Sequence, residues 1–383
     1  MLYNLFQYLE KMKISGAGVF HYISFRASLS GILSLLLALL VGKYLIGWLQ
    51  KKQIGESIRE LGLEGQMQKK GTPTMGGIII VISIVIPTLL FSRFTDDSNH
   101  LNAYVLLMIV STIWMGTIGL LDDYIKVYKK NKEGMKATTK LIGQLMLGVI
   151  IAIVIDYAHK QAHIPLETNL PITKHRLSYT DLIPGDNNAW YIYVPIIIFI
   201  CMAVTNAVNF TDGIDGLAAG TTAIVGVGLG ILAYAAGNHK FADYLNIIYV
   251  PNSGEVVVFL AAVIGSCLGF LWYNGYPAQV FMGDTGSMAL GGAIAAVSII
   301  IKMELLIPIL CGVFFAESLS VVMQVSWFKY TKKRFGEGRR IFLMSPLHHH
   351  YQKKNIPESK ITLRFWLITV VLVLATLALL KLR

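Results

Sequence analysis

Apolar windows of about 20 residues recur along this chain, and no other feature limits its fold as strongly. A helix of that length crosses the hydrocarbon core of a bilayer. The chain is 55% hydrophobic and only 14% charged, whereas soluble domains carry about 25% charged residues. Because the windows are continuously apolar and do not alternate along the chain, they favour helices over a transmembrane barrel. The sequence predicts an all-α, polytopic membrane protein.

Ten membrane-spanning helices are predicted from these windows. They cover residues 27–49, 76–94, 102–121, 141–158, 191–210, 217–237, 256–273, 288–304, 305–326 and 362–381. Only the stretch IKMELLIP separates the eighth span from the ninth. No internal repeat or low-complexity segment is visible, so residues 1–383 are predicted to form a single domain.

Lys and Arg residues are distributed unevenly between the two sides of this arrangement. The loops 50–75, 122–140 and 327–361 carry 20 of them, and the loops and termini of the other side carry 11. Cytoplasmic loops carry the excess of Lys and Arg, so the first side is predicted to be cytoplasmic and both termini periplasmic. The net charge of +11 therefore does not indicate a nucleic-acid partner. A phosphate-rich substrate would also suit the basic side, and Lys130 is a candidate to bind it.

Five polar motifs fall on the predicted cytoplasmic side. They are KKGTPTMGG before the second span, GLLDDYIK after the third, NAVNFTDGIDG after the fifth, NGYPAQVFMGDTGS before the eighth and SPLHHHYQ before the tenth. A random distribution would place such motifs on both sides of the membrane. The five motifs therefore predict one composite site.

Asp122 and Asp123 stand at the predicted C-terminal end of the third span. They can simply be a solvated helix end. A helix C-terminus disfavours carboxylates by about 0.3–1 kcal/mol each, however, and a bound cation would reverse this effect. Carboxylate ligands point to Mg²⁺, which also binds substrate phosphates.

Asn206, Asn209, Asp212 and Asp215 follow one another at intervals of three residues. Local capping of a turn explains either aspartate alone, but not the two asparagines inside the helix. Residues three apart lie near one helix face, so the series predicts a polar groove wall that binds substrate.

Asp284 stands just before the predicted start of the eighth span, where Asp is a favoured helix cap. The functional alternative is that Gly283 lets backbone N–H groups approach a phosphate at the helix N-terminus. Asp284 would then bind the Mg²⁺ that contacts the same phosphate.

Three further candidates are the consecutive histidines His348, His349 and His350. Their side chains diverge in any regular element, so they cannot all bind one metal ion. They can donate hydrogen bonds to phosphate or sugar, or belong to a solvated loop. Glu317, in the ninth span, is an ionisable residue inside the membrane and is predicted to face the same groove.

The stretches GTPTMGG, LDDYIK, VNFTDGIDGLA, FMGDTGSMALGG and SPLHHHYQ together resemble the phospho-N-acetylmuramoyl-pentapeptide transferase family. That family is a branch of the polyprenyl-phosphate N-acetylhexosamine-1-phosphate transferases. The resemblance covers roughly residues 40–380, with the five motifs in the same order. Residues 1–25 and 159–190 show the least of the family pattern.

The resemblance implies an Mg²⁺-dependent reaction in the bacterial inner membrane, in which UDP-N-acetylmuramoyl-pentapeptide and undecaprenyl phosphate give lipid I and UMP. It implies that Asp122 and Asp123 are the catalytic acidic pair and that Asp284 binds Mg²⁺. It also implies a possible homodimer. By the same resemblance, the uridine pocket comprises Lys69, Asp215, Asn274 and Phe281. The adjoining groove comprises Thr74, Asn209 and Asp212, and the three histidines lie near the diphosphate.

The sequence leaves three alternatives and one mechanistic choice open. The alternatives are a related transferase of GlcNAc-1-phosphate, a secondary transporter and a lipid-binding scaffold without catalysis. Against the transporter, the motifs lie at helix ends and not at the bilayer midplane. An acidic residue can either deprotonate the lipid phosphate or form a covalent intermediate.

Overall fold

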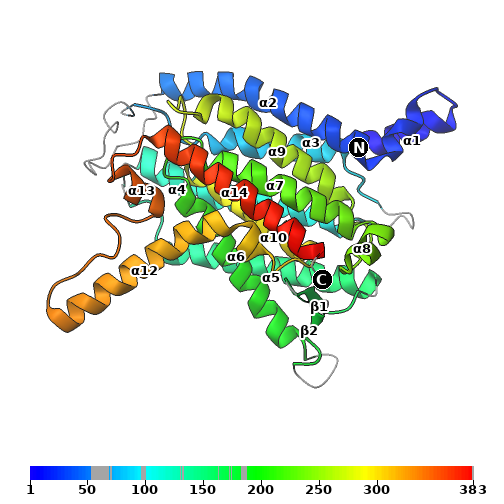
Figure 1. Ribbon diagram of the computed structural model, residues 1–383. Coiled ribbons are helices and arrows are strands. Elements are labelled where there is room, and N and C mark those ends of the chain that lie inside the picture. The colour runs from blue at the N-terminus through cyan, green and yellow to red at the C-terminus, as the bar shows by residue number, and fades with distance from the viewer. Residues whose placement is uncertain are drawn as a thin grey trace.

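The computed structural model describes residues 1–52, 69, 71–95, 101–129, 131, 133–162, 164–171, 173, 175–182 and 188–381. Within them the chain is predominantly helical (Figure 1). The elements are α1 (Leu2–Lys11), η1 (Ala17–His21), α2 (Ile23–Lys51), α3 (Gly77–Phe91), α4 (Ala103–Tyr128), α5 (Ala137–Ala162), β1 (Glu167–Asn169), β2 (Arg176–Ser178), α6 (Trp190–Thr211), α7 (Leu217–Ala236), α8 (His239–Leu245), α9 (Glu255–Asn274), α10 (Gly283–Ile300), α11 (Ile307–Leu310), α12 (Gly312–Phe335), α13 (Leu347–Gln352) and α14 (Glu358–Lys381).

Eight of the described helices are long and apolar enough to cross a membrane, namely α2, α4, α5, α6, α7, α9, α10 and α14. This finding confirms the prediction of a multi-pass, helical membrane protein. α3 is apolar but has only 15 residues, and α12 is less apolar and ends in basic residues. The total of ten spans and their orientation stay predictions.

Three expectations about the helices are wrong in detail. The third predicted span does not end at residue 121, because α4 continues to Tyr128 and places the acidic pair within the helix. The eighth begins earlier, at Gly283, because its first turn is capped by a side chain from another helix. The ninth is broken near Cys311 into α11 and α12, and α12 runs on to Phe335. Residues 159–190 also contain a short antiparallel hairpin, β1–β2.

α10 is the most buried of the eight apolar helices, and α3, α4 and α6 pack around it. Its sequence, rich in Gly, Ala and Ser, lets neighbouring backbones come close. On α4, a Cβ at Gly119 would lie 2.1 Å from the Asp284 carbonyl oxygen, so this approach requires glycine. The close contact brings the acidic pair of α4 to the first turn of α10.

α13 and the start of α14 lie at one end of the helical bundle in Figure 1, and α1, α8 and the hairpin lie at the other. At the second end the hairpin is fastened to the connection after α10. The Thr168 hydroxyl donates to Glu304 Oε2, and the Asn169 side chain donates to the Lys302 carbonyl oxygen at 2.9 Å. Thr168 and Asn169 therefore fasten the hairpin to the bundle at the end away from α13.

Candidate active site

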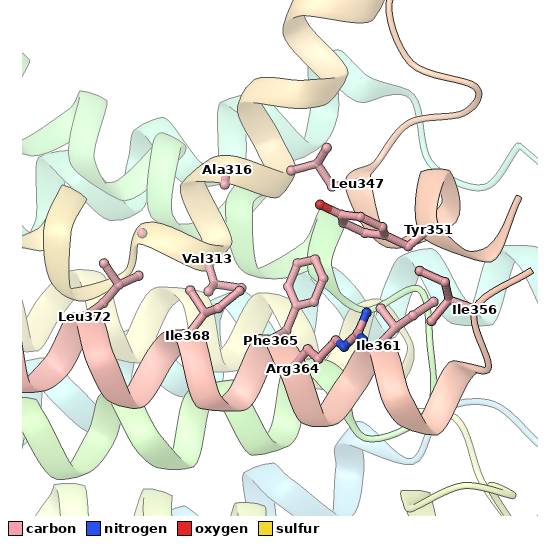
Figure 2. Close-up of a pocket in the computed structure, with 11 residues that line it drawn as sticks. Val313, Ala316, Leu347, Tyr351, Ile356, Ile361, Arg364, Phe365, Ile368 and Leu372 are labelled. Atoms are coloured by element: carbon pink, nitrogen blue, oxygen red, sulfur yellow. The ribbon is translucent and has the colours of Figure 1, made fainter. Parts of the chain in front are cut away.

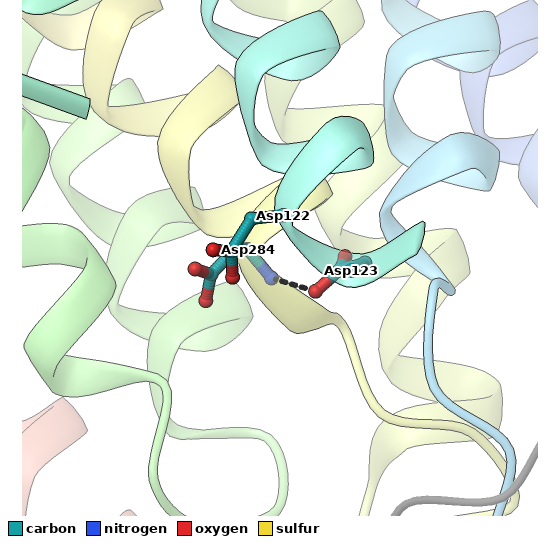
Figure 3. A group of neighbouring side chains, drawn as sticks. All are labelled: Asp122, Asp123 and Asp284. Atoms are coloured by element: carbon teal, nitrogen blue, oxygen red, sulfur yellow. Dashed lines mark hydrogen bonds between the residues drawn. The ribbon is translucent and has the colours of Figure 1, made fainter. Parts of the chain in front are cut away.

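Asp122, Asp123 and Asp284 form an acidic cluster between α4 and α10 (Figure 3). One carboxylate oxygen from each lies within 4.8 Å of the others. Asp122 and Asp123 are buried, and Asp284 is partly exposed. Residues from two sequence motifs therefore meet at one point, as the composite-site prediction requires.

Asp123 caps the N-terminus of α10. Its Oδ1 accepts from the Asp284 backbone N–H at 3.1 Å, and its Oδ2 accepts from the Thr285 backbone N–H at 3.0 Å and the Thr285 hydroxyl at 2.6 Å. Gly283 has a φ of +71°, and a Cβ there would lie 2.6 Å from Asp123 Oδ2. Helix N-terminal N–H groups favour a carboxylate partner, so Asp123 fixes the position of Asp284.

The capping alternative for Asp284 is wrong, because Asp123 supplies the cap and the Asp284 carboxylate accepts from Asn209 and Lys140 instead. Its Oδ1 accepts from the Asn209 amide at 3.1 Å, and its Oδ2 pairs with Lys140 and lies 3.3 Å from Lys126 Nζ. Asp284 therefore points away from its own helix backbone and toward the other side chains of the cluster.

Lys126 and Lys140 lie between Asp122 and Asp284. Lys126 Nζ is 2.6 Å from Asp122 Oδ2, and Lys140 Nζ is 3.0 Å from Asp122 Oδ1. The backbone N–H of Met135 also donates to Asp122 Oδ1 at 2.7 Å. Asp122 and Asp284 thus share two ammonium groups, whereas Asp123 is held by the first turn of α10.

The cluster fits a divalent metal ion by its chemistry. All its potential ligands are carboxylate oxygens, which suit Mg²⁺ and do not suit a soft metal. Both lysines approach the same carboxylates, which shows that the cluster attracts cations. Asp123 has three protein donors, but a carboxylate offers about four lone-pair positions, so it can still bind a cation.

A second group of side chains surrounds Lys69. Lys69 Nζ donates to Asp215 Oδ1 at 2.6 Å and lies 5.8 Å from the centre of the Phe281 ring. The Phe281 ring is half-buried. Asn274 accepts from the Gly216 backbone N–H at 3.0 Å and donates to the Val280 carbonyl oxygen, so it connects the two loops of this pocket. All four predicted uridine-pocket residues lie here.

The segment before α3 pairs with the loop that carries Phe281. The Phe281 backbone N–H donates to the Pro73 carbonyl oxygen at 2.8 Å, and the Gly76 backbone N–H donates to the Phe281 carbonyl oxygen at 2.9 Å. Thr74, between them, is buried. The backbone pairing therefore fixes the position of the aromatic ring.

The three histidines lie on α13 and diverge, as the sequence predicts. The Glu317 carboxylate accepts from the His348 backbone N–H at 3.2 Å and lies 3.2 Å from His348 Nδ1, with both side chains fully buried. His349 Nδ1 pairs with Gln352 Oε1 at 2.7 Å, and His350 Nδ1 accepts from the Leu343 backbone N–H. Glu317 thus contacts His348 and not the acidic cluster. Burial lowers the pKa of His349 to about 4, and the nearby His348 adds to this effect.

The predicted polar series at the end of α6 does not stay together. Asn206 forms a reciprocal amide pair with Gln144, Asn209 bonds to Asp284 and Ser287, and Asp215 belongs to the Lys69 pocket. Asp212 ends the helix and is half-buried. A drift of about 60° at each step of three residues explains the separation. Lys130 lies outside the described residues.

An apolar pocket of about 400 Å³ lies beside the histidine helix, between α12 and α14 (Figure 2). Phe365, Ile368 and Leu372 line it from α14, Val313 and Ala316 from α12, and Leu347 and Tyr351 from α13. Arg364 is the cationic residue of its lining. The sequence reading did not include this pocket.

Comparison with known proteins gives two matches to family models. The model described as glycosyl transferase family 4 matches residues 104–302, and signature 1 of phospho-N-acetylmuramoyl-pentapeptide-transferase matches residues 69–81. Curated relatives with the latter name cover the full length of both chains. They are 51% identical in Flavobacterium psychrophilum and 50% identical in both Parabacteroides distasonis and Chlorobium phaeobacteroides.

The chain belongs to the phospho-N-acetylmuramoyl-pentapeptide-transferase family. The family signature covers Lys69 and Thr74, and the glycosyl transferase model covers the whole acidic cluster. The resemblance that the motifs suggest is therefore confirmed at the level of the family.

Sequence reasoning missed several side chains that contact the predicted site residues. They are Lys126, Lys140, Gln352 and Glu358. A signal existed for Lys126, because it follows Asp122 by four residues on a helix and can pair with it. A signal also existed for Gln352, because it follows His349 by three residues on α13. Lys140 and Glu358 pair across loops, which their spacing in the sequence does not reveal.

Proposed function

We propose that this chain transfers phospho-N-acetylmuramoyl-pentapeptide from UDP-N-acetylmuramoyl-pentapeptide to undecaprenyl phosphate, giving lipid I and UMP. It would act as a single domain in the bacterial inner membrane, with ten spans, both termini periplasmic and this site at the cytoplasmic face. The observation that carries the proposal is the neighbourhood of an acidic cluster and a Lys–Asp–Phe pocket, in a chain about 50% identical to transferases of that name.

In this proposal the Lys69 group binds the uridine part of the donor and the acidic cluster binds its diphosphate. The Phe281 ring offers a stacking surface for the nucleobase, and Lys69 and Asp215 offer a donor and an acceptor at its edge. The acidic cluster then receives the diphosphate. The proposal puts the groove residues Thr74, Asn209 and Asp212 and the histidines of α13 around the diphosphate. Asn209 supports this because it donates to Asp284.

Catalysis here is mainly positioning and neutralisation of charge, since one phosphate attacks another. Mg²⁺ bound by Asp122, Asp123 and Asp284 would supply positive charge to the diphosphate. Asp123 fixes the first turn of α10 and thus the direction of Asp284. Lys126 and Lys140 carry two positive charges at the same place, which reduces the repulsion between donor and acceptor phosphates.

The apolar pocket between α12 and α14 suits the acceptor lipid. Its lining is almost entirely aliphatic and aromatic, and it adjoins α13, which carries the histidines. A polyprenyl chain in this pocket would place its phosphate at the end near Arg364 and Tyr351. Undecaprenyl phosphate is the acceptor that this shape and chemistry favour.

A donor-exchange assay tests the proposed reaction. The purified chain receives undecaprenyl phosphate, MgCl₂ and either UDP-N-acetylmuramoyl-pentapeptide or UDP-GlcNAc, and the lipid-linked product is measured by thin-layer chromatography. The proposal expects product from the muramoyl donor. Product from UDP-GlcNAc alone would identify the related transferase, and no product with either donor would contradict the proposal.

A further inference from the structure

Glu358, the first residue of α14, is the third partner in the Lys69 pocket and has no role in the proposed function so far. Its Oε1 accepts from Lys69 Nζ at 2.5 Å and from the Asp215 backbone N–H at 2.7 Å. The side chain is largely buried, with 8% of its surface exposed. One carboxylate oxygen therefore fixes both the lysine and the turn that carries Asp215.

The second oxygen of Glu358 points to the histidine helix. Its Oε2 accepts from the Gln352 amide at 3.3 Å, and Gln352 Oε1 pairs in turn with His349 Nδ1 at 2.7 Å. The carboxylate is thus oriented from both sides. Its place at a helix N-terminus also favours the negative charge.

The surroundings keep Lys69 in its charged form. Burial alone would lower the pKa of Lys69, but the negative charges of Glu358 and then of Asp215 outweigh burial and raise it above its usual range. A lysine ammonium is a hydrogen-bond donor and cannot accept. Lys69 Nζ lies 5.8 Å from the centre of the Phe281 ring, so the polar edge of a base stacked on that ring comes within its reach.

We infer that Glu358 is a positioning residue that determines base specificity, because it directs Lys69 as a fixed donor toward a uracil ring. This inference rests on the proposed function, in which the nucleobase stacks on Phe281. Uracil presents a carbonyl oxygen at C4 and an N–H at N3, which match the Lys69 ammonium and the Asp215 carboxylate. Cytosine presents an amino group and a bare nitrogen at the same positions, which match neither. A site with fixed hydrogen-bonding groups rejects the mismatched ligand strongly.

The test compares Glu358→Gln with a charge-matched control, Glu337→Gln, at an exposed glutamate just after the end of α12. Glutamine keeps an acceptor for the Asp215 N–H and loses the charge that orients Lys69. We expect the KM for UDP-N-acetylmuramoyl-pentapeptide to rise about tenfold, as for a lost charge-assisted hydrogen bond, with kcat within about twofold. UMP and CMP serve as competing ligands, and the ratio of their inhibition constants should fall by about tenfold toward unity. Glu337→Gln should match the unaltered chain.

Two results would overturn the inference. One is a Glu358→Gln variant whose KM and UMP/CMP ratio equal those of the control. The other is a loss of kcat and thermal stability with an unchanged ratio, which would give Glu358 a merely structural role. If Glu358→Gln does not fold, Glu358→Asp replaces it, because the shorter side chain withdraws the carboxylate from Lys69. An unchanged ratio of the UMP and CMP inhibition constants in Glu358→Asp would also contradict the inference. An unaltered chain that turns over no UDP-linked donor would instead refute the proposed function.

Discussion

Substitution of Asp123 by Asn should separate a structural carboxylate from a chemical one in the acidic cluster. Asp123 accepts three hydrogen bonds from the first turn of α10. Asparagine has one oxygen, so whichever way its amide lies, at least one backbone N–H of the first turn of α10 would face the NH₂ group and lose its acceptor. A buried unsatisfied donor costs about 1–3 kcal/mol, and the lost charge at the helix N-terminus costs about 0.3–1 kcal/mol more.

The sum is about 1.3–4 kcal/mol for Asp123→Asn. At roughly 2 °C for each kcal/mol in a chain of this size, the melting temperature should fall by about 3–8 °C. Asp284→Asn is the matched variant, because it keeps an acceptor for the Asn209 amide and leaves the Asp123 cap intact. Its melting temperature should stay within about 2 °C, while turnover falls at least about 100-fold if the carboxylate binds the metal.

The assay is thermal unfolding by tryptophan fluorescence in one detergent, together with UMP release for the same samples. Equal melting temperatures for Asp123→Asn and the unaltered chain would show that the capping argument is wrong. Near-normal turnover of Asp284→Asn with an unshifted Mg²⁺ requirement would remove Asp284 from the metal site.

Three further predictions concern the pocket and the histidine helix. Phe281→Ala should weaken binding of the UDP donor at least severalfold, since base–aromatic stacking contributes about 1–3 kcal/mol; unchanged affinity in a folded variant would show that no base stacks there. Glu317→Ala should lower stability by about 1–3 kcal/mol, measured by thermal unfolding, because it leaves the buried His348 backbone N–H without an acceptor; Glu317→Gln, which still accepts from that N–H, should lose much less. Burial lowers the pKa of His349 to about 4, against about 6.5 when unfolded, so the unfolded chain binds more protons between these values. Stability should therefore fall as the pH drops from about 6.5 to 4, and His349→Gln should flatten this part of the pH–stability curve; an unchanged slope would contradict the burial argument.

The sequence predicted the helices well because a bilayer demands long apolar segments and admits few alternatives. Its errors lie where another part of the chain decides. α10 begins at Gly283, before the predicted residue 288, because Asp123 of α4 caps the Gly-rich stretch there. α14 begins at Glu358, before the predicted residue 362, and the partners of Glu358, Lys69 and Asp215, are distant in sequence.

The site residues show the same contrast between features set by local sequence and features set by distant parts of the chain. Motifs of local character, such as the acidic pair and the Gly283–Asp284 turn, predicted where charged groups meet. The interval of three residues in Asn206, Asn209 and Asp215 did not predict a shared surface, because each step rotates the side chain about 60°. Each of the three therefore has a different partner, namely Gln144, Asp284 and Lys69.

The most direct test of the central claim is the metal dependence of UMP release. The purified chain is stripped with EDTA and given UDP-N-acetylmuramoyl-pentapeptide and undecaprenyl phosphate, and UMP is measured as MgCl₂ is added back. If the three aspartates bind Mg²⁺ for phosphosugar transfer, UMP should appear only when MgCl₂ and the lipid acceptor are both present, in equal amount to the lipid-linked product. Full UMP release in EDTA, or none at saturating MgCl₂ with both substrates present, would contradict it.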